Sequence, residues 1–374
     1  MKSSPIFSAI LVVLLLATSV SAAEWEVVKS PNAGNQANSL SAIASAADND
    51  LWAVGWSFDQ RLNAYRTLIE HWNGANWSVV GSPNATNGYN FLNGLAVAAA
   101  NDIWAIGQAA NGSIYSTLIE HWNGSTWSIF PSPNIPGRSN ILEAVTVVSP
   151  TDIWAVGSSL DPGTFNTFAL TLHYDGVAWT IHPSPILDHD ILFAVDAIAS
   201  NDIWAVGSSF QEKKTLTMHF DGSNWSIVPS PNGIGDNIFF GVAAVASNSV
   251  WAVGQAGSLS TLAEHWDGSN WVIVPTPNFD PNATNLALIG IVALASNNIW
   301  TAGQYIVPLQ GSAQFTLTEN WDGTNWNFVP SPNRRNSNNR LQGIAATPSG
   351  TMWAVGTTGL FTKPERTLIL RRTP

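Results

Sequence analysis

The sequence predicts an all-β fold, a seven-bladed β-propeller of four-stranded antiparallel blades, and three observations support this prediction. A motif centred on a tryptophan occurs seven times, at spacings of 47 to 53 residues. Asn-Gly or Asp-Gly, a strong hairpin signal, occurs at the same place in six of the units. An isolated copy of the last strand of the repeat precedes the first complete unit, where it can complete the last one. Repeated four-stranded units that close on themselves are typical of propellers.

Residues 1–23 are predicted to be a secretory signal peptide, followed by the propeller at 24–374. Lys2 precedes an apolar run from Ala9 to Val20, and the small residues 21–23 follow it. The run is shorter than the roughly 20 residues that a spanning helix needs. We therefore expect an extracytoplasmic protein, secreted or periplasmic, without membrane insertion.

Seven units are recognised by the pattern N-D-I-W-A-I-G at 101–107 and its variants. Their central tryptophans are Trp52, Trp104, Trp154, Trp204, Trp251, Trp300 and Trp353. A second pattern, T-L-I-E-H-W-N-G-A-N-W at 67–77, follows the first in each unit except the last, which has only its beginning.

Each unit resolves into four strands, as the second unit illustrates. A small apolar run at 92–98 predicts the first strand, and 103–107 the second. Residues 117–122 predict the third strand, and 127–130 the fourth, with Asn-Gly between them. A β-solenoid is the alternative, but its units are shorter and it needs no strand from the other end of the chain.

Trp25 begins the isolated copy of the fourth strand. It lies 27 residues before Trp52, the same distance that separates Trp77 from Trp104. The first strand of the mature chain is therefore expected to complete the last blade and close the ring.

The runs W-A-V-G and H-W-D-G-x-x-W resemble the repeats of secreted bacterial propellers. These include Asp-box proteins of the sialidase-like and photosystem-assembly-factor-like kinds, kelch-like propellers, and the fucose-binding and tectonin-like lectins. The resemblance covers almost the whole mature chain and implies the blade structure. Asp267 and Trp271 are four residues apart, where an Asp-box has five, and the double glycine of kelch repeats is absent.

Composition excludes several classes of function. The 374 residues carry a net charge of -11, which argues against nucleic-acid binding because phosphate contacts need clustered Lys and Arg. The chain has no cysteine, so thiol catalysis, disulfides and cysteine-ligated metals are excluded. No phosphate loop, nucleophile elbow or metal-binding helix motif is present, and we expect no cofactor.

The two rims of the predicted ring differ in how much their loops vary. Turns between first and second strands, and between third and fourth, are short and nearly identical. The opposite rim, called here the variable rim, is formed by loops at 56–66, 108–116, 158–166, 208–214, 255–260, 304–315 and 357–366 and by crossovers such as 135–140, 186–190 and 334–340. Binding residues tend to lie on variable loops of a rigid scaffold. The candidate ligand-binding residues are Trp56, Tyr65, Arg66, Tyr115, Arg138 and His189.

Residues that recur in every unit are interpreted as structural. Trp104 and its equivalents are expected to pack against the next blade. Neighbours such as Glu70 and His71 point to opposite faces of a strand and cannot act on one atom. Asp102 and its equivalents are interpreted as turn caps in preference to calcium ligands.

Two acidic residues depart from the repeat pattern. Glu143 and Asp196 interrupt first strands that are otherwise small and apolar, and we expect both to line the central channel. Paired carboxylates would be needed for glycoside hydrolysis, and no spacing of arginines marks a sialidase-like site.

The sequence therefore predicts a monomeric, non-catalytic binding scaffold that recognises a glycan or an extracellular protein on the variable rim. The alternative is a glycoside hydrolase or lyase-type enzyme with its site at the mouth of the channel. A structural component of the envelope is the third interpretation. Because the loops differ between blades, one or a few sites are expected in place of seven equivalent ones.

Overall fold

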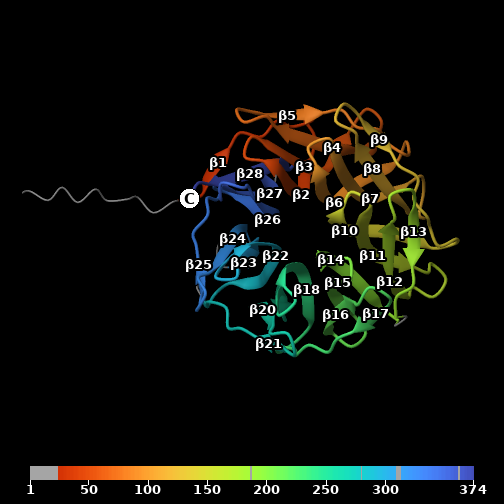
Figure 1. The fold of residues 1–374 in the computed structure, drawn as a ribbon. Helices are drawn as coiled ribbons and strands as arrows, with labels where there is room; N and C mark the ends of the chain where they lie inside the picture. Colours follow the sequence, from red (N-terminus) through yellow and green to blue (C-terminus); the bar gives the residue numbers. More distant parts are fainter. Residues whose placement is uncertain (1–23, 186–187, 279, 309–312, 361–362) are drawn as a thin grey trace, which may run out of the picture.

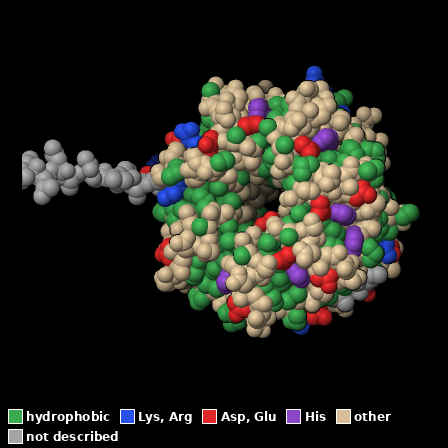
Figure 2. All heavy atoms as spheres, viewed as in Figure 1, with side chains coloured by type: hydrophobic (Ala, Val, Ile, Leu, Met, Phe, Trp, Pro, Cys, Tyr) green, Lys and Arg blue, Asp and Glu red, His purple; other side chains and the backbone are tan. Residues whose placement is uncertain are grey.

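The computed structural model describes residues 24–185, 188–278, 280–308, 313–360 and 363–374, which form seven four-stranded antiparallel sheets. Figure 1 shows these sheets as blades arranged in a ring, and the space-filling view in Figure 2 shows the hollow of the channel at its centre. The predicted seven-bladed β-propeller is confirmed. In the described part of the chain, no helix has the length and apolar character required to span a bilayer. The predicted signal peptide, 1–23, lies outside the described residues.

The strands of each blade follow the chain from the channel outward, except that the outermost strand of blade 7 comes from the N-terminal end. The innermost strands of blades 1 to 7 are β2 (Asn38–Ala47), β6 (Tyr89–Ala99), β10 (Ser139–Ser149), β14 (Asp190–Ala199), β18 (Asn237–Ala246), β22 (Thr284–Ala295) and β26 (Ser337–Ala346). The second strands are β3 (Asp50–Asp59), β7 (Asp102–Ala110), β11 (Asp152–Leu160), β15 (Asp202–Ser209), β19 (Ser249–Ala256), β23 (Asn298–Val307) and β27 (Met352–Leu360).

The two outer strands are shorter. The third strands are β4 (Ala64–Trp72), β8 (Ser116–Trp122), β12 (Thr167–Tyr174), β16 (Lys214–Phe220), β20 (Ser260–Trp266), β24 (Ala313–Trp321) and β28 (Arg366–Arg372). The outermost strands are β5 (Trp77–Val80), β9 (Trp127–Ile129), β13 (Trp179–His182), β17 (Trp225–Ile227), β21 (Trp271–Ile273), β25 (Trp326–Phe328) and, in blade 7, β1 (Glu26–Val28).

The ring closes through the N-terminal strand, as the spacing of Trp25 predicts. Strand β1 pairs antiparallel with β28, with Val27 opposite Leu370. An ion pair of 2.5 Å joins Glu26 to Arg371 across the same pair of strands. The ring of Trp25 is 6.2 Å from that of Trp300 in blade 6, so the borrowed strand also contributes to the core between blades.

The hydrophobic core lies between adjacent blades. Trp104 of blade 2 is 1% exposed and packs against blade 3, where its ring lies 4.8 Å from Tyr174 and 5.7 Å from Trp179. Leu142 and Ile153 of blade 3 belong to the same cluster. The prediction that these tryptophans pack against the next blade is confirmed. Each blade is thus held by its two neighbours, and the loops stand on a rigid ring.

The hairpins between third and fourth strands are confirmed, but their turns are longer than a two-residue turn. In blade 1 the amide of Asn73 donates to the carbonyl of Asn76. Only Gly74 of this turn has a positive φ, +92°. The side chain of Asn73 accepts hydrogen bonds from the amides of Ala75 and Asn76, which explains why Asn or Asp precedes the glycine.

Candidate functional site

An aromatic surface crosses the variable rim over blades 1 and 2 and reaches the loop before β8. Its rings lie close together: Trp56 is 5.2 Å from Tyr65, Tyr65 is stacked 5.6 Å from Tyr89, and Tyr89 is 6.3 Å from Tyr115. We call this surface the aromatic band, and it consists of Trp56, Phe58, Tyr65, Tyr89, Phe91 and Tyr115. The structure therefore brings together three of the six predicted residues, Trp56, Tyr65 and Tyr115.

The aromatic band is available to a ligand. Tyr89 is 40% exposed, and Tyr65 and Tyr115 are partly exposed. Their three hydroxyl groups hydrogen-bond to no other residue that the structure describes. Rigid aromatic side chains with free hydroxyls provide contact area and hydrogen bonds at small cost in conformational entropy.

Arg66 lies beside the aromatic band. Its guanidinium donates to the carbonyl oxygen of Thr86 at 3.1 Å, which orients the side chain. Together with Phe58, Arg61 and Asp59 it lines a cavity of about 560 Å³ between the loop of blade 1 and the crossover at 33–36, and Asp59 pairs with Arg61 at 3.6 Å. This cavity continues the aromatic band toward blade 7.

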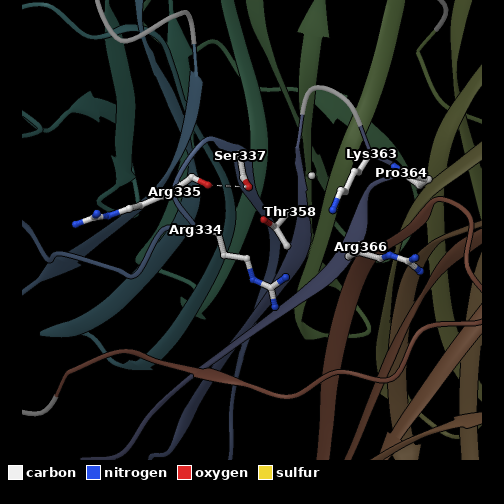
Figure 3. A pocket seen from close by; sticks show the side chains of 8 residues that line it. Arg334, Arg335, Ser337, Thr358, Lys363, Pro364 and Arg366 are labelled. Carbon is white, nitrogen blue, oxygen red and sulfur yellow. Dashed lines mark hydrogen bonds between the residues drawn. The ribbon is translucent and has the colours of Figure 1, made fainter.

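A positively charged pocket follows on blade 7. It has a volume of about 330 Å³, and its charged lining residues are Arg334, Arg335, Lys363 and Arg366. Figure 3 shows that Arg334 and Lys363 point toward Thr358 at its centre, whereas Arg335 extends away from it. We call it the basic pocket.

Few acidic groups balance the charge of the basic pocket. Arg340 pairs with Glu365 at 3.4 Å, and the guanidinium of Arg366 donates to the carbonyl of Asn35 at 2.9 Å. Arg334 and Lys363 are exposed and form no ion pair with any described carboxylate. The pocket therefore offers two free cations to a ligand.

The other predicted site residues lie elsewhere. The guanidinium of Arg138 stacks 4.2 Å above the ring of Phe168 in blade 3. His189 has a φ of +68°, and its amide donates to the carbonyl of Thr167, so it shapes the crossover into blade 4. The structure does not bring Arg138 and His189 into the aromatic band.

Sequence reasoning missed Phe58, Tyr89 and Phe91, although they complete the aromatic band. Tyr89 and Phe91 precede the predicted start of the first strand at 92, and in the structure β6 begins at Tyr89. Lys363 and Arg366 were missed as well. The signal for them was that 334–340 contains three arginines and 363–366 a lysine and an arginine, in a chain with few cations.

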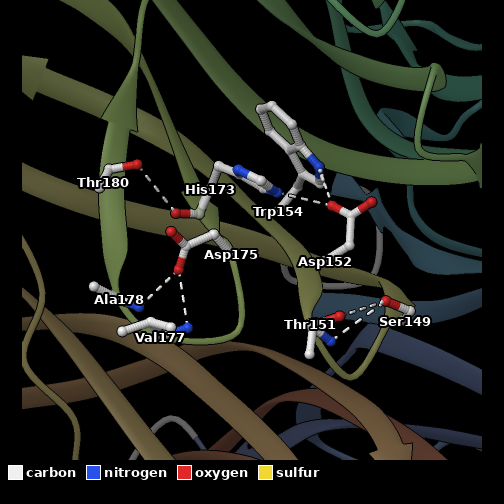
Figure 4. A network of polar contacts seen from close by, with 9 residues as sticks. All are labelled: Ser149, Thr151, Asp152, Trp154, His173, Asp175, Val177, Ala178 and Thr180. Atoms are coloured by element: carbon white, nitrogen blue, oxygen red, sulfur yellow. Dashed lines mark hydrogen bonds and ion pairs between the residues drawn. The ribbon is translucent and has the colours of Figure 1, made fainter.

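The recurring aspartates, histidines and tryptophans form a structural cluster on the opposite rim (Figure 4). In blade 3 the carboxylate of Asp152 accepts from the indole of Trp154 at 2.9 Å and contacts His173 Nε2 at 2.8 Å. His173 also stacks on Trp154, with ring centroids 4.4 Å apart. Asp152 thus binds side chains, where the sequence predicted a cap of the backbone. The same arrangement occurs in blades 1, 2 and 4, and Figure 2 shows the histidines around this face.

Glu143 and Asp196 line the channel, as predicted, but they do not form a catalytic pair. Glu143 lines a cavity near the variable rim, whereas Asp196 lines a separate one with residues 291–295. Asp196 accepts hydrogen bonds from the amides of Ala197 and Ala244, and from Thr146. Both of its oxygens therefore connect neighbouring strands. Among the described residues, no second carboxylate lines the cavity at Glu143, as glycoside hydrolysis would need. Within the described residues, no group of three His, Asp or Glu side chains could hold a metal ion.

Comparison with solved structures identifies proteins of the same architecture. YCF48 bound to a D1 peptide superposes with a TM-score of 0.60 at 13% identity, covering 94% of this chain and 95% of that one. The chain shares this fold. YCF48 from Cyanidioschyzon merolae gives a TM-score of 0.56 at 14% identity, covering 94% of this chain and 99% of that one. No protein-family model and no curated protein matches the sequence.

Proposed function

We propose that this protein is an exported, monomeric, non-catalytic binding propeller that holds an acidic, extended segment of a partner protein on its variable rim. One observation carries the proposal. The chain from 24 to 374 has 13 Lys and Arg, and seven of them lie on the rim of blades 7 and 1. These residues are Arg61, Arg66, Arg334, Arg335, Arg340, Lys363 and Arg366.

Charge and shape both favour an extended acidic peptide. Neighbouring cations repel one another, so their clustering on one sector of a protein with a net charge of -11 costs free energy that a bound anionic ligand would offset. The basic pocket, the cavity beside Arg66 and the aromatic band follow one another around the rim. A peptide could place carboxylates in the basic pocket and in the cavity beside Arg66, and apolar side chains on the aromatic band. The YCF48 propeller bound to a D1 peptide shows that this architecture can hold a peptide.

Removing the two free cations of the basic pocket is expected to weaken acidic-peptide binding about tenfold or more, since tenfold corresponds to about 1.4 kcal/mol. The measurement is fluorescence anisotropy of a labelled hexa-aspartate peptide with wild type and with the R334Q/K363Q variant. Binding should also weaken as salt increases, because the contacts are exposed.

The matched control is K213Q/K214Q, which removes two charges from the same rim at blade 4, where Lys213 pairs with Asp236 and Lys214 with Glu212. We expect this control to bind nearly as well as wild type. Equal losses in both variants would indicate long-range attraction only, and unchanged binding by R334Q/K363Q would overturn the proposed site.

A glycan is the second candidate ligand, and the free hydroxyls of the aromatic band favour it. Sugar rings stack on aromatic faces, and their hydroxyls would pair with those of Tyr65, Tyr89 and Tyr115. If a glycan array identifies a ligand, Tyr89→Ala should reduce its binding about tenfold, or about 1.4 kcal/mol. Tyr174→Phe, which alters a tyrosine at the end of β12 in blade 3, near the opposite rim, is the control. A blank array would remove this candidate.

A further inference from the structure

Every blade has a β-bulge at the same place in its innermost strand. In blade 3 the register shifts between Leu142 and Ala144, which leaves Glu143 unpaired with β11. The shift recurs in the other six blades. The seven bulged residues are Ser41, Asn93, Glu143, Phe193, Phe240, Ile289 and Gln342.

The fold restricts the neighbours of each bulge but leaves the bulged side chain free to vary. The residue before it is a fully buried Leu or Phe, such as Leu92. The residue after it is Ala or Gly, because the strands crowd there: a Cβ on Gly94 would lie 3.0 Å from the carbonyl oxygen of Glu143. All seven bulged residues line one cavity of about 190 Å³ in the half of the channel nearer the variable rim. We call it the channel mouth.

The channel mouth is polar on one side and apolar on the other. Gln342, Ser41, Asn93 and Glu143 come from the consecutive blades 7, 1, 2 and 3, and the other three blades supply Phe193, Phe240 and Ile289. The rings of Phe193 and Phe240 lie 5.4 Å apart. Phe193 also contacts Phe210, which is 43% exposed on the rim, with ring centroids 6.4 Å apart. An apolar path therefore leads from the rim into the channel.

Among the described residues that line the channel mouth, Glu143 is the one ionisable group. Its Oε2 accepts a hydrogen bond from Asn93 Nδ2 at 3.1 Å, and Asn93 is held in turn by Gln108 Oε1 at 2.8 Å. Its Oε1 has no partner among the described residues. No described Lys, Arg or His lines this cavity, so within the described part of the chain the carboxyl lacks a counter-ion. Burial raises its pKa to about 7, which shows that this site disfavours an unpaired carboxylate.

We propose that the channel mouth binds a long cationic side chain, arginine or lysine, carried by the partner segment on the rim. Its charged end would pair with Glu143 Oε1, which forms a charge-assisted hydrogen bond. Its aliphatic stem would lie along Phe193 and Phe240, whose faces also attract a cation. A volume of 190 Å³ equals that of about six water molecules, which suits one such side chain. The assignment of this side chain to a partner protein rests on the proposed function. The cation site itself does not depend on that function.

The first test uses N-acetyl-arginine N-methylamide as the probe. The probe is titrated into the full chain while the Ile289 methyl groups are followed by NMR. We expect saturable shifts with the arginine probe, and binding at least about tenfold weaker for its neutral citrulline analogue or for Glu143→Gln, which removes the charge. Asp236→Asn, an exposed carboxylate on the same rim, is the control and should bind like wild type. Equal binding of the two probes, or undiminished binding by Glu143→Gln, would overturn the proposal.

Two further measurements separate the possible outcomes. If Glu143→Gln does not fold, Phe240→Leu tests the opposite wall and should also weaken binding of the arginine probe. Hexa-aspartate binding is measured on the same samples. If the wild-type protein binds hexa-aspartate but not the arginine probe, this inference alone is refuted, and if it binds the arginine probe but not hexa-aspartate, the proposed function alone is refuted.

Discussion

The free energy of unfolding is expected to fall as the pH rises from about 4.5 to about 8, because four buried glutamates hold protons in the folded state. Burial raises the pKa of Glu70, Glu120, Glu264 and Glu319 from 4.5 to about 8. The native protein therefore binds protons that the unfolded chain releases in this range. By linkage, the stability that these glutamates contribute is fully present below their unfolded-state pKa of 4.5. It is lost progressively as the pH rises toward their folded-state pKa of about 8.

The environment of these glutamates explains the shift. All four are 0% exposed. Glu70 Oε2 accepts a hydrogen bond from Ser30 at 2.9 Å, but for Glu264 neither oxygen has a partner among the described residues. Blades 3, 4 and 7 have Leu172, Met218 and Leu370 at the equivalent position, so the fold does not require a carboxyl there.

Glu264→Gln is expected to raise the free energy of unfolding at about pH 9 by about 2 kcal/mol or more and to leave it nearly unchanged at about pH 4. The upper limit for one carboxyl with this shift is about 5 kcal/mol. Urea unfolding of wild type and variant across this pH range is the measurement. Glu212→Gln, on a side chain that is 62% exposed, is the control and should have little effect. A wild-type stability that does not decrease toward pH 9 would contradict the explanation.

Replacing Gly107 with alanine is expected to destabilise the protein by about 3 kcal/mol or more, because the added methyl group cannot be accommodated. An added Cβ would lie 2.1 Å from the carbonyl oxygen of Phe91 and 3.0 Å from the Cα of Leu92. Both are backbone atoms of β6, the strand paired with β7, so they cannot rotate away. The same clash, between 1.9 and 2.1 Å, occurs at the equivalent glycines Gly55, Gly157, Gly207, Gly254, Gly303 and Gly356.

Thermal unfolding of Gly107→Ala is compared with that of Gly81→Ala. Gly81 has no neighbour within 4 Å of an added Cβ and has a negative φ. We expect the Gly81 variant to be as stable as wild type or slightly more stable, because alanine reduces the entropy of the unfolded chain. Similar melting temperatures for the two variants would show that the strands at Gly107 can separate to admit the methyl group.

The prediction of the fold from the sequence succeeded because the blade is a local unit that is written seven times. Trp104 and its equivalents mark the second strand, and Asn-Gly or Asp-Gly marks each outer hairpin. Ring closure could be predicted as well, because the strand that begins at Trp25 matches the fourth strand of the repeat. It lies at the N-terminal end of the ring, whereas the unit that lacks this strand lies at the C-terminal end. The need for glycine at the end of W-A-V-G was not evident, because the carbonyl that excludes a side chain belongs to another strand.

The candidate site was predictable only in part. Trp56, Tyr65 and Tyr115 were found because the scaffold does not require aromatic residues at these positions of the predicted loops, although the structure extends β3 and β4 so that Trp56 and Tyr65 lie in strands. Their contact through Tyr89 depends on how blades 1 and 2 are juxtaposed. Arg138 and His189 satisfied the same criterion, yet they lie elsewhere on the rim.

By itself the sequence determined the class of fold, the number of blades, the closing strand and the rim that varies. These properties follow from local hydrogen bonding, from the alternation of apolar and polar residues along each strand and from turn chemistry, all of which repeat along the chain. The tertiary structure alone decided which loops meet, because residues from 33 to 366 converge on one sector of the ring. It also decided that a bulge turns one side chain of each blade, Glu143 among them, into the channel. Such positions depend on contacts between blades, and no single repeat contains that information.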